Sequence, residues 1–236
     1  LRLVVLPIVP TPSGYELLNA ETAREQGYLK LAQWLERAES EWNRLRGSKS
    51  HRYSLTGWID HRRNLSQQSP TARYRVLYPD VNRIMTACVV ELSPERLSGV
   101  VVDTTCYFCE TDDEFEAHYL CALLNAPMID ERLGALRRKE QKTHPHVHKK
   151  IFDVAAFPLY DANDAKHREL AELGRACAQK VSEALDSGVL DKNLEIGSLR
   201  RRTRELLAAE LAAIDDLARA LVSSQESLPE SRTGDT

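Results

Sequence analysis

Three histidines at alternate positions, His144, His146 and His148, are the side chains in this sequence whose spacing most plainly suggests chemistry. On a strand, side chains two residues apart face the same side, and three imidazole nitrogens are a plausible zinc cage. Pro145 would interrupt the strand pairing, and Asp153 is the one nearby carboxylate that could orient the ligands. We therefore expect no bound metal, and we keep a metal-dependent enzyme built on the histidines as an alternative.

Lysines surround these histidines in a chain that is acidic as a whole. Residues 137–150 contain six Lys or Arg and one acid, Glu140, whereas the net charge of the chain is −3. A local positive surface on an acidic protein favours an anionic partner, and nucleic acids are the longest anions in a cell. Lysine neutralises phosphates without reading sequence, so the candidates for phosphate contacts are Lys142, Lys149 and Lys150.

A second polar group contains residue types that can read bases. Arginine bonds guanine through two donors, and Asn or Gln bonds adenine in the same bidentate way. The candidates for base contacts are therefore Arg62, Arg63, Gln67, Gln68, His144 and His146. Arg52, Arg73 and Arg75 extend this basic group. A solvated charged surface remains the plain alternative for all of these residues, and we favour it for the arginines at 200–204.

Signals of catalysis are missing from the sequence. It contains no Gly-rich loop after a strand, no G-x-S-x-G elbow and no Asn/Asp-Pro-Pro-aromatic tetrapeptide. Cys106 and Cys109 have the spacing of half a zinc site, but on a strand they would face opposite sides and no second pair follows. We therefore expect free thiols and a protein that recognises rather than transforms its partner.

The composition limits the class of protein. With 42% hydrophobic residues the chain can form a core. No apolar run approaches the ~18 residues of a membrane span, so we expect a cytoplasmic protein without a membrane partner. The chain begins at Leu1 rather than at Met, and we expect a fragment or a partner of something larger.

Hydrophobic periodicity predicts the elements that must position these residues. An amphipathic helix is expected at 22–46, followed by a linker at 47–50. A helix is expected from 111 to 125, opened by a capping box of Thr111 and Glu114. Two further amphipathic stripes predict a helical hairpin within 163–222. The expected strands are 73–78, 84–91, 100–109 and 151–157.

These elements predict an α/β fold of the α+β kind, in which a mixed-sheet recognition domain follows a linker helix and precedes a helical hairpin. The expected divisions are an N-terminal strand and linker helix at 1–50, a recognition domain at 51–160, the helical hairpin at 161–222 and a disordered tail at 223–236.

Three segments carry a resemblance to a known family. They are RYSLTGWIDHRRNLSQQSPTARYRVLY, VVVDTTCYFCETDDEFEAHYLCALLNAPMIDERL and HPHVHKKIFDVAAFPLYDANDAKHRELAELG. In order and spacing they resemble the C-terminal target-recognition region of adenine-specific DNA methyltransferases of restriction-modification type, the TaqI-like specificity domain. The resemblance covers residues 17–180. It departs at 78–82, where Tyr-Pro-Asp-Val-Asn replaces a loop that often contains Gly or Ser.

The resemblance implies a function. Such a chain would recognise double-stranded DNA for a methyltransferase domain or subunit of a restriction-modification or phage-defence system, and other subunits of that system are further expected partners. S-adenosylmethionine and the flipped adenine would lie on that separate domain, so this chain would carry no cofactor and would not be an enzyme by itself. The remaining alternative is a scaffold subunit that docks through its C-terminal helices.

Overall fold

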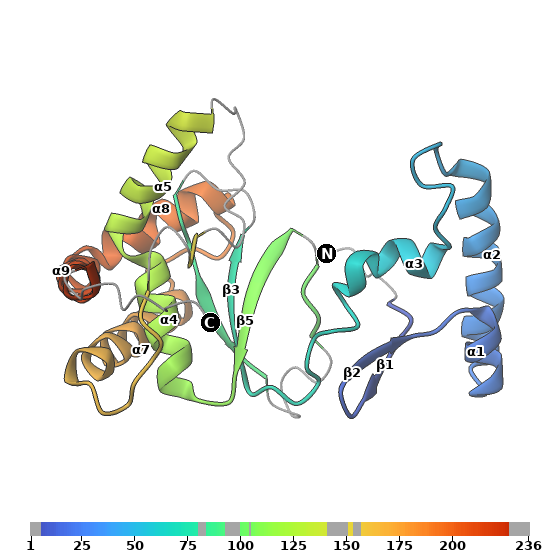
Figure 1. The fold of residues 1–236 in the computed structure, drawn as a ribbon, viewed down its shortest axis with the longest axis horizontal. Coiled ribbons are helices and arrows are strands. Elements are labelled where there is room, and N and C mark those ends of the chain that lie inside the picture. Colours follow the sequence, from blue (N-terminus) through green and yellow to red (C-terminus); the bar gives the residue numbers. More distant parts are fainter. Residues whose placement is uncertain are drawn as a thin grey trace, which may run out of the picture. The chain divides into compact units, whose positions relative to one another are not determined.

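A computed structural model describes residues 6–79, 84–92, 100–103, 105–140, 151–152 and 157–226, without the side chains of 135–140 and 224–226. In these residues the fold is the mixed α+β type that the sequence predicts, with helices in the majority. The chain divides into two compact units (Figure 1). Unit 1 takes its described residues from Leu1–Ala72 and Ser93–Thr104, and unit 2 takes them from Arg73–Leu92 and Thr105–Thr236.

Unit 1 begins with a two-stranded antiparallel hairpin and continues with short and long helices. Its elements are β1 (Ile8–Thr11), β2 (Gly14–Leu17), α1 (Ala20–Glu25), α2 (Leu29–Leu45), α3 (Leu55–Ile59) and a 3-10 turn, η1 (His61–Arg63). Its apolar core cluster contains Leu18, Ala23, Ala32 and Leu35, all from the first half of the unit. Residues 51–68 therefore depend largely on polar and aromatic contacts for their shape.

The single helix predicted at 22–46 is two helices in the structure. Asn19 caps α1, because its side-chain oxygen accepts a hydrogen bond from the Thr22 amide at 2.8 Å. The helices separate at Gly27, whose φ of 82° is a left-handed conformation that glycine adopts without a steric penalty. The prediction missed this break because the apolar stripe that suggested the helix lies almost entirely in α2.

Unit 2 contains a three-stranded antiparallel sheet in the order β4-β3-β5. The strands are β3 (Tyr74–Pro79), β4 (Cys88–Glu91) and β5 (Cys106–Thr111). The alternation predicted at 73–78 is confirmed: Tyr74, Val76 and Tyr78 are buried in the main core, and Arg75 lies on the opposite face between them.

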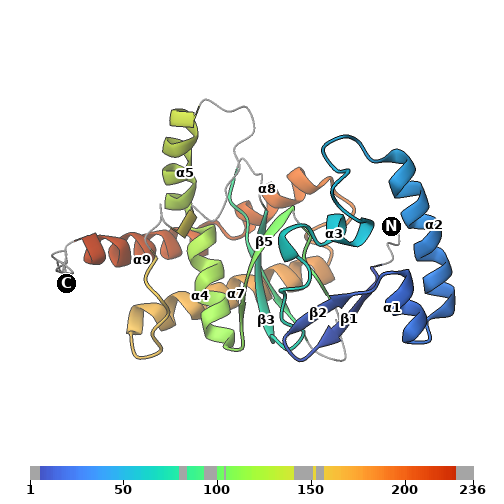
Figure 2. The ribbon, with the colours of Figure 1, turned by 45° about the vertical axis from the view of Figure 1, so that its right-hand side comes forward.

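The helices of unit 2 are α4 (Glu114–Asn125), α5 (Pro127–Glu140), α7 (Ala165–Asp186), α8 (Ile196–Leu206) and α9 (Ala208–Glu226). α4 packs on the face of the sheet that carries the core residues of β3, and the other helices of unit 2 pack around α4 and one another (Figures 1 and 2). α4 and α7 cross closely at Gly174, where an added Cβ would lie 2.4 Å from the His118 carbonyl oxygen. Leu170 and Ile214 join the same core as the strands. Residues 161–222 are therefore part of unit 2, and they form three helices rather than the expected hairpin.

Polar side chains fix the ends of several elements in unit 2. The side-chain oxygen of Asn125 accepts from the Ala87 N–H at 3.1 Å, and its side-chain nitrogen donates to the Ala87 carbonyl at 3.0 Å. Asp215 of α9 accepts from the Met128 amide at 2.6 Å and so satisfies a free donor at the start of α5.

The start of α4 corrects the predicted capping box. Asp113, not Thr111, caps the helix, because its side-chain oxygen accepts from the amides of Phe115 at 2.7 Å and Glu116 at 3.2 Å. The Thr111 hydroxyl instead accepts from the Asp113 amide at 3.1 Å. Both residues are good cap formers two positions apart, and the sequence pattern matched the earlier one.

The predicted strands also change in extent. β4 begins at Cys88 and β5 at Cys106, so both are shorter than predicted. The strand expected at 151–157 is wrong in the part that is described, because Ile151 and Phe152 are helical. A short apolar run fits a buried helix as well as a strand.

Among the helices in the described part of the chain, none combines the length and apolar character that a bilayer crossing requires.

Candidate nucleic-acid interface

Two consecutive arginines in unit 1 adopt an unusual backbone conformation. Arg62 has φ 59° and ψ 26°, and Arg63 has φ 60°. Among the described residues these are the only non-glycine positions with positive φ. For an L-residue with a side chain this conformation costs about 1–2 kcal/mol. Such strain persists only where the surroundings hold it, and it is concentrated at functional sites.

Hydrogen bonds on both sides of the arginines hold this turn. One carboxylate oxygen of Asp60 accepts from the amides of Leu65 at 2.8 Å and Ser66 at 3.0 Å. The Asp60 carbonyl accepts from the Arg63 amide at 2.8 Å. Leu65 is buried directly after the turn and anchors it. The aspartate therefore closes a loop from which the two arginine side chains emerge.

Gln68 fastens the far side of the turn. Its side chain is fully buried, at 0% exposure. Its Nε2 donates to the Val102 carbonyl at 2.7 Å and to the Asn64 carbonyl at 2.9 Å, and its Oε1 accepts from the Val102 amide at 2.8 Å. An amide bonded at both ends and shielded from solvent cannot reach a base edge in this conformation. Gln68 thus has a structural role, unlike the base contact suggested by its residue type.

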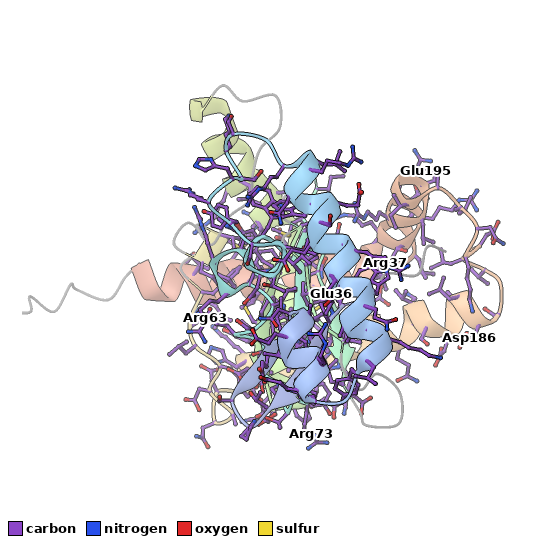
Figure 3. All side chains as sticks on the ribbon, turned by 90° about the vertical axis from the view of Figure 1, so that its right-hand side faces the viewer. Glu36, Arg37, Arg63, Arg73, Asp186 and Glu195 are labelled. Carbon is purple, nitrogen blue, oxygen red and sulfur yellow. The ribbon has the colours of Figure 1, made fainter. Side chains whose placement is uncertain are left out.

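The other three candidates in this segment are exposed. Arg62, Arg63 and Gln67 all lie on the surface of unit 1. Figure 3 shows the Arg63 side chain extending away from the ribbon. In the described part of the chain, no carboxylate forms an ion pair with Arg62 or Arg63, although Arg24 and Arg44 of the same unit are paired. Both guanidinium groups are therefore open to an anionic partner.

A group of aromatic rings precedes the turn, and the sequence interpretation did not identify it. The Trp58 ring centroid lies 5.5 Å from that of Trp42, 5.6 Å from that of Tyr53 and 6.0 Å from that of His61. Tyr53 and His61 also meet edge to face, with centroids 5.4 Å apart. The usable signal was the interleaving of aromatic and basic residues between Arg52 and Arg63.

The aromatic group is attached to α2 by hydrogen bonds. The Trp42 indole N–H donates to the Tyr53 carbonyl at 3.3 Å, and Arg46 donates to the carbonyls of His51 at 2.9 Å and Tyr53 at 3.1 Å. The Arg52 guanidinium lies over the Tyr53 ring, 5.0 Å from its centroid. The exposed or half-exposed residues of the aromatic group and of the neighbouring turn form one surface of unit 1. We call it the 52–67 surface, and it comprises Arg52, Tyr53, Trp58, His61, Arg62, Arg63 and Gln67.

The lysine and histidine candidates lie outside the described residues. This applies to Lys142, Lys149 and Lys150 and to His144 and His146, so the predicted phosphate contacts and the histidine site stay predictions. In the ranges that the structure does describe, no cluster of His, Cys, Asp and Glu could hold a metal. Cys109 packs against the main core and Cys106, three residues earlier, is not part of it, which agrees with the predicted opposite faces.

The structure separates the wider basic group. Arg75 is 1% exposed and forms an ion pair with Glu110 at 2.8 Å, so it is a structural residue of unit 2. Arg204 donates to the Met85 carbonyl at 3.3 Å and lies 3.5 Å from an Asp130 oxygen. Arg201 and Arg202 are exposed on α8, as expected for a solvated helix surface.

Neither a family model nor a curated protein matches this sequence. The functional interpretation therefore depends on the geometry of the 52–67 surface and on the resemblance described from the sequence.

Proposed function

We propose that this chain binds double-stranded DNA and supplies target recognition to an adenine-specific methyltransferase of a restriction-modification or phage-defence system. The observation that carries the proposal is the strained turn at Arg62 and Arg63, which presents two exposed guanidinium groups that form no ion pair with a carboxylate of the described residues. Adjacent Gln67 adds an exposed amide. Arginine and glutamine are the side chains best suited to bidentate contacts with guanine and adenine.

The charge of the segment supports a nucleic acid as the partner. Residues 51–68 contain three arginines and one acid, Asp60, and one Asp60 oxygen accepts two backbone amides. With the histidines neutral the segment carries +3 − 1 = +2 in a chain of net charge −3. Such a local surface attracts phosphates although the chain as a whole repels them.

The resemblance supplies the narrower class. It implies that S-adenosylmethionine and the catalytic groups belong to a methyltransferase domain or subunit separate from residues 1–236, and that this chain has no catalytic role alone. The first test is selection of duplexes from a random library by the whole chain, followed by sequencing. Enrichment of one motif is the expected result.

Affinity measurements on the selected duplex then locate the contact. We expect Arg62→Gly to weaken binding by about tenfold or more, since a lost bidentate contact costs about 1–3 kcal/mol. Arg37→Ala, an exposed arginine on α2 (Figure 3), removes the same charge outside the 52–67 surface and should change little. Failure of the wild-type chain to bind any duplex at low salt, alone or with its methyltransferase, would reject the proposal.

One observation favours the alternative of a protein-interaction subunit. Trp34 is 41% exposed and Leu45 is 68% exposed on α2. The spacing of these two residues and Ala38 places all three on one face of the helix. Exposed apolar residues on one helix face are typical of a docking surface. If this alternative holds, the wild-type chain binds no DNA, and Trp34→Ala disrupts its complex with a partner protein.

A further inference from the structure

The placement of Trp58 is not explained by packing in a core. It lies on α3, a helix of five residues in which none is buried. The Ser54 hydroxyl accepts from the Gly57 amide at 3.0 Å and so stabilises this single turn. Trp58 is 43% exposed although the ring centroids of Trp42, Tyr53 and His61 all lie within 6.0 Å of its own. The helix therefore holds a large aromatic ring at the surface.

We infer that Trp58, supported by Tyr53, is a stacking site for one unstacked nucleobase, with the neighbouring arginines contacting its phosphates. Stacking on an aromatic side chain contributes to binding every base, because every base has a π-face. Neighbouring rings already fix the Trp58 indole, so little side-chain freedom is lost when a base stacks on it. This inference depends on the proposed DNA binding and adds the form of DNA that this surface prefers.

The surrounding charge selects a nucleotide over other ligands of aromatic clusters. Groups of Trp and Tyr also bind quaternary ammonium ions. Here the Arg52 guanidinium already lies over Tyr53, and the exposed Arg62 and Arg63 follow His61 directly. A second cation would be repelled by these arginines, whereas a base with an attached phosphate satisfies both the rings and the charges.

A paired base within a regular duplex cannot use this site, because its faces are covered by its neighbours. The ligand is therefore a base that is extrahelical in a duplex or part of a single strand. Three probes distinguish these sources: a fully paired duplex, the same duplex with one unpaired 2-aminopurine, and the single strand. Stacking on Trp58 changes the fluorescence of 2-aminopurine, which reports the contact itself and not only the affinity.

The variants are Trp58→Ala, Trp58→Phe and the control Trp34→Ala, which changes a similarly exposed tryptophan on α2 that stacks on no other ring within the described residues. We expect wild type to prefer a probe with an unpaired base over the paired duplex. Trp58→Ala should lose about tenfold on that probe and nothing on the paired duplex, since stacking contributes about 1–3 kcal/mol per base. Trp58→Phe should restore part of the loss, and Trp34→Ala should match wild type.

The outcomes separate the two proposals. If Arg62→Gly weakens DNA binding while Trp58→Ala binds every probe as wild type does, the stacking site is rejected and the proposed function stands. If wild type binds none of the probes, both are rejected. Tryptophan quenching by a trimethyl-lysine peptide without DNA binding would identify a cation cage and would also reject the inference. Preference for the bulged duplex or the single strand identifies the source of the base.

Discussion

Two pairs of arginines, one in each unit of the molecule, have opposite surroundings. In unit 2, Arg75 is buried against Glu110, and Arg219 bridges Asp215 and Glu131, each at 2.8 Å. In unit 1, Arg62 and Arg63 are exposed on a strained turn and no described carboxylate pairs with them. The comparison shows that the count of basic residues does not locate a binding surface. A binding surface is located by asking which guanidinium groups already have a carboxylate partner within the protein.

The backbone shows the same contrast. Arg75 lies in a regular strand whose register with β5 brings it opposite Glu110. Arg62 and Arg63 lie in left-handed conformations that lower stability and that Asp60 and Gln68 counteract. A structural arginine should therefore stabilise the fold, whereas an arginine kept for binding should lower its stability slightly.

The largest expected effect is on stability in unit 2. Arg75→Ala removes a guanidinium group that is 1% exposed together with its ion pair to Glu110, and it leaves a cavity, so we expect a loss of about 3 kcal/mol in the free energy of unfolding. Urea denaturation measures it. The double variant Arg75→Ala/Glu110→Ala should lose less than the sum of the single variants. A loss as small as that of Arg37→Ala would break the contrast between the two sets of arginines.

Two neighbouring glutamines sharpen the comparison within unit 1. Gln68→Ala removes three hydrogen bonds and leaves the Val102 amide without its acceptor, while the Val102 carbonyl keeps the Asn64 side-chain donor at 3.3 Å, so we expect a loss of about 2 kcal/mol in the free energy of unfolding. The exposed Gln67→Ala should change stability by about 0.5 kcal/mol or less and should act on DNA binding instead. Equal melting temperatures for the two variants would show that the turn is not held by Gln68.

A smaller effect of opposite sign is expected at the strained turn. Arg62→Gly relieves a positive φ, and the free energy of unfolding should rise by about 0.5–1 kcal/mol while DNA binding weakens. Arg62→Ala keeps the strain and removes the charge, so it should weaken binding without the gain in stability. If glycine destabilises the protein as much as alanine, the strain argument is wrong.

The smallest effect concerns pH and a buried histidine of unit 2. Burial lowers the pKa of His118, with Glu114 raising it and Arg175 lowering it. The unfolded state then binds more protons than the folded state below the ordinary pKa of about 6.5, so this contribution to stability falls as the pH drops through that region. Urea unfolding at neutral and mildly acidic pH should show a smaller drop for His118→Asn than for wild type. If wild type and His118→Asn lose the same stability, other titratable groups cause the pH dependence.

Part of this arrangement was predictable from local patterns. The alternation at 73–78 predicted β3 and the burial of Tyr74, Val76 and Tyr78, because the two faces of a strand differ at every second residue. The same pattern places Arg75 opposite the core, but its pairing depends on Glu110, 35 residues away. Residue type alone therefore grouped Arg75 with the binding arginines.

The details of the candidate site were not predictable from sequence. Gln67 and Gln68 are the same residue type at adjacent positions, and only the contact with Val102 distinguishes the buried one. Neither the left-handed φ of Arg62 nor the meeting of Trp42 with Trp58 follows from periodicity, because the first is held by the hydrogen bonds of Asp60 and Gln68 and the second depends on how α3 is attached to α2. These features come from tertiary contacts between short segments.

The most direct test of the central claim is the dissociation constant for the selected duplex, measured for wild type, Arg62→Gly/Arg63→Gly and Arg37→Ala. We expect the double variant to remain folded, to be at least as stable as wild type and to bind at least about tenfold more weakly, while Arg37→Ala should bind as wild type does. A double variant that binds as tightly as Arg37→Ala would contradict the assignment of the 52–67 surface to DNA.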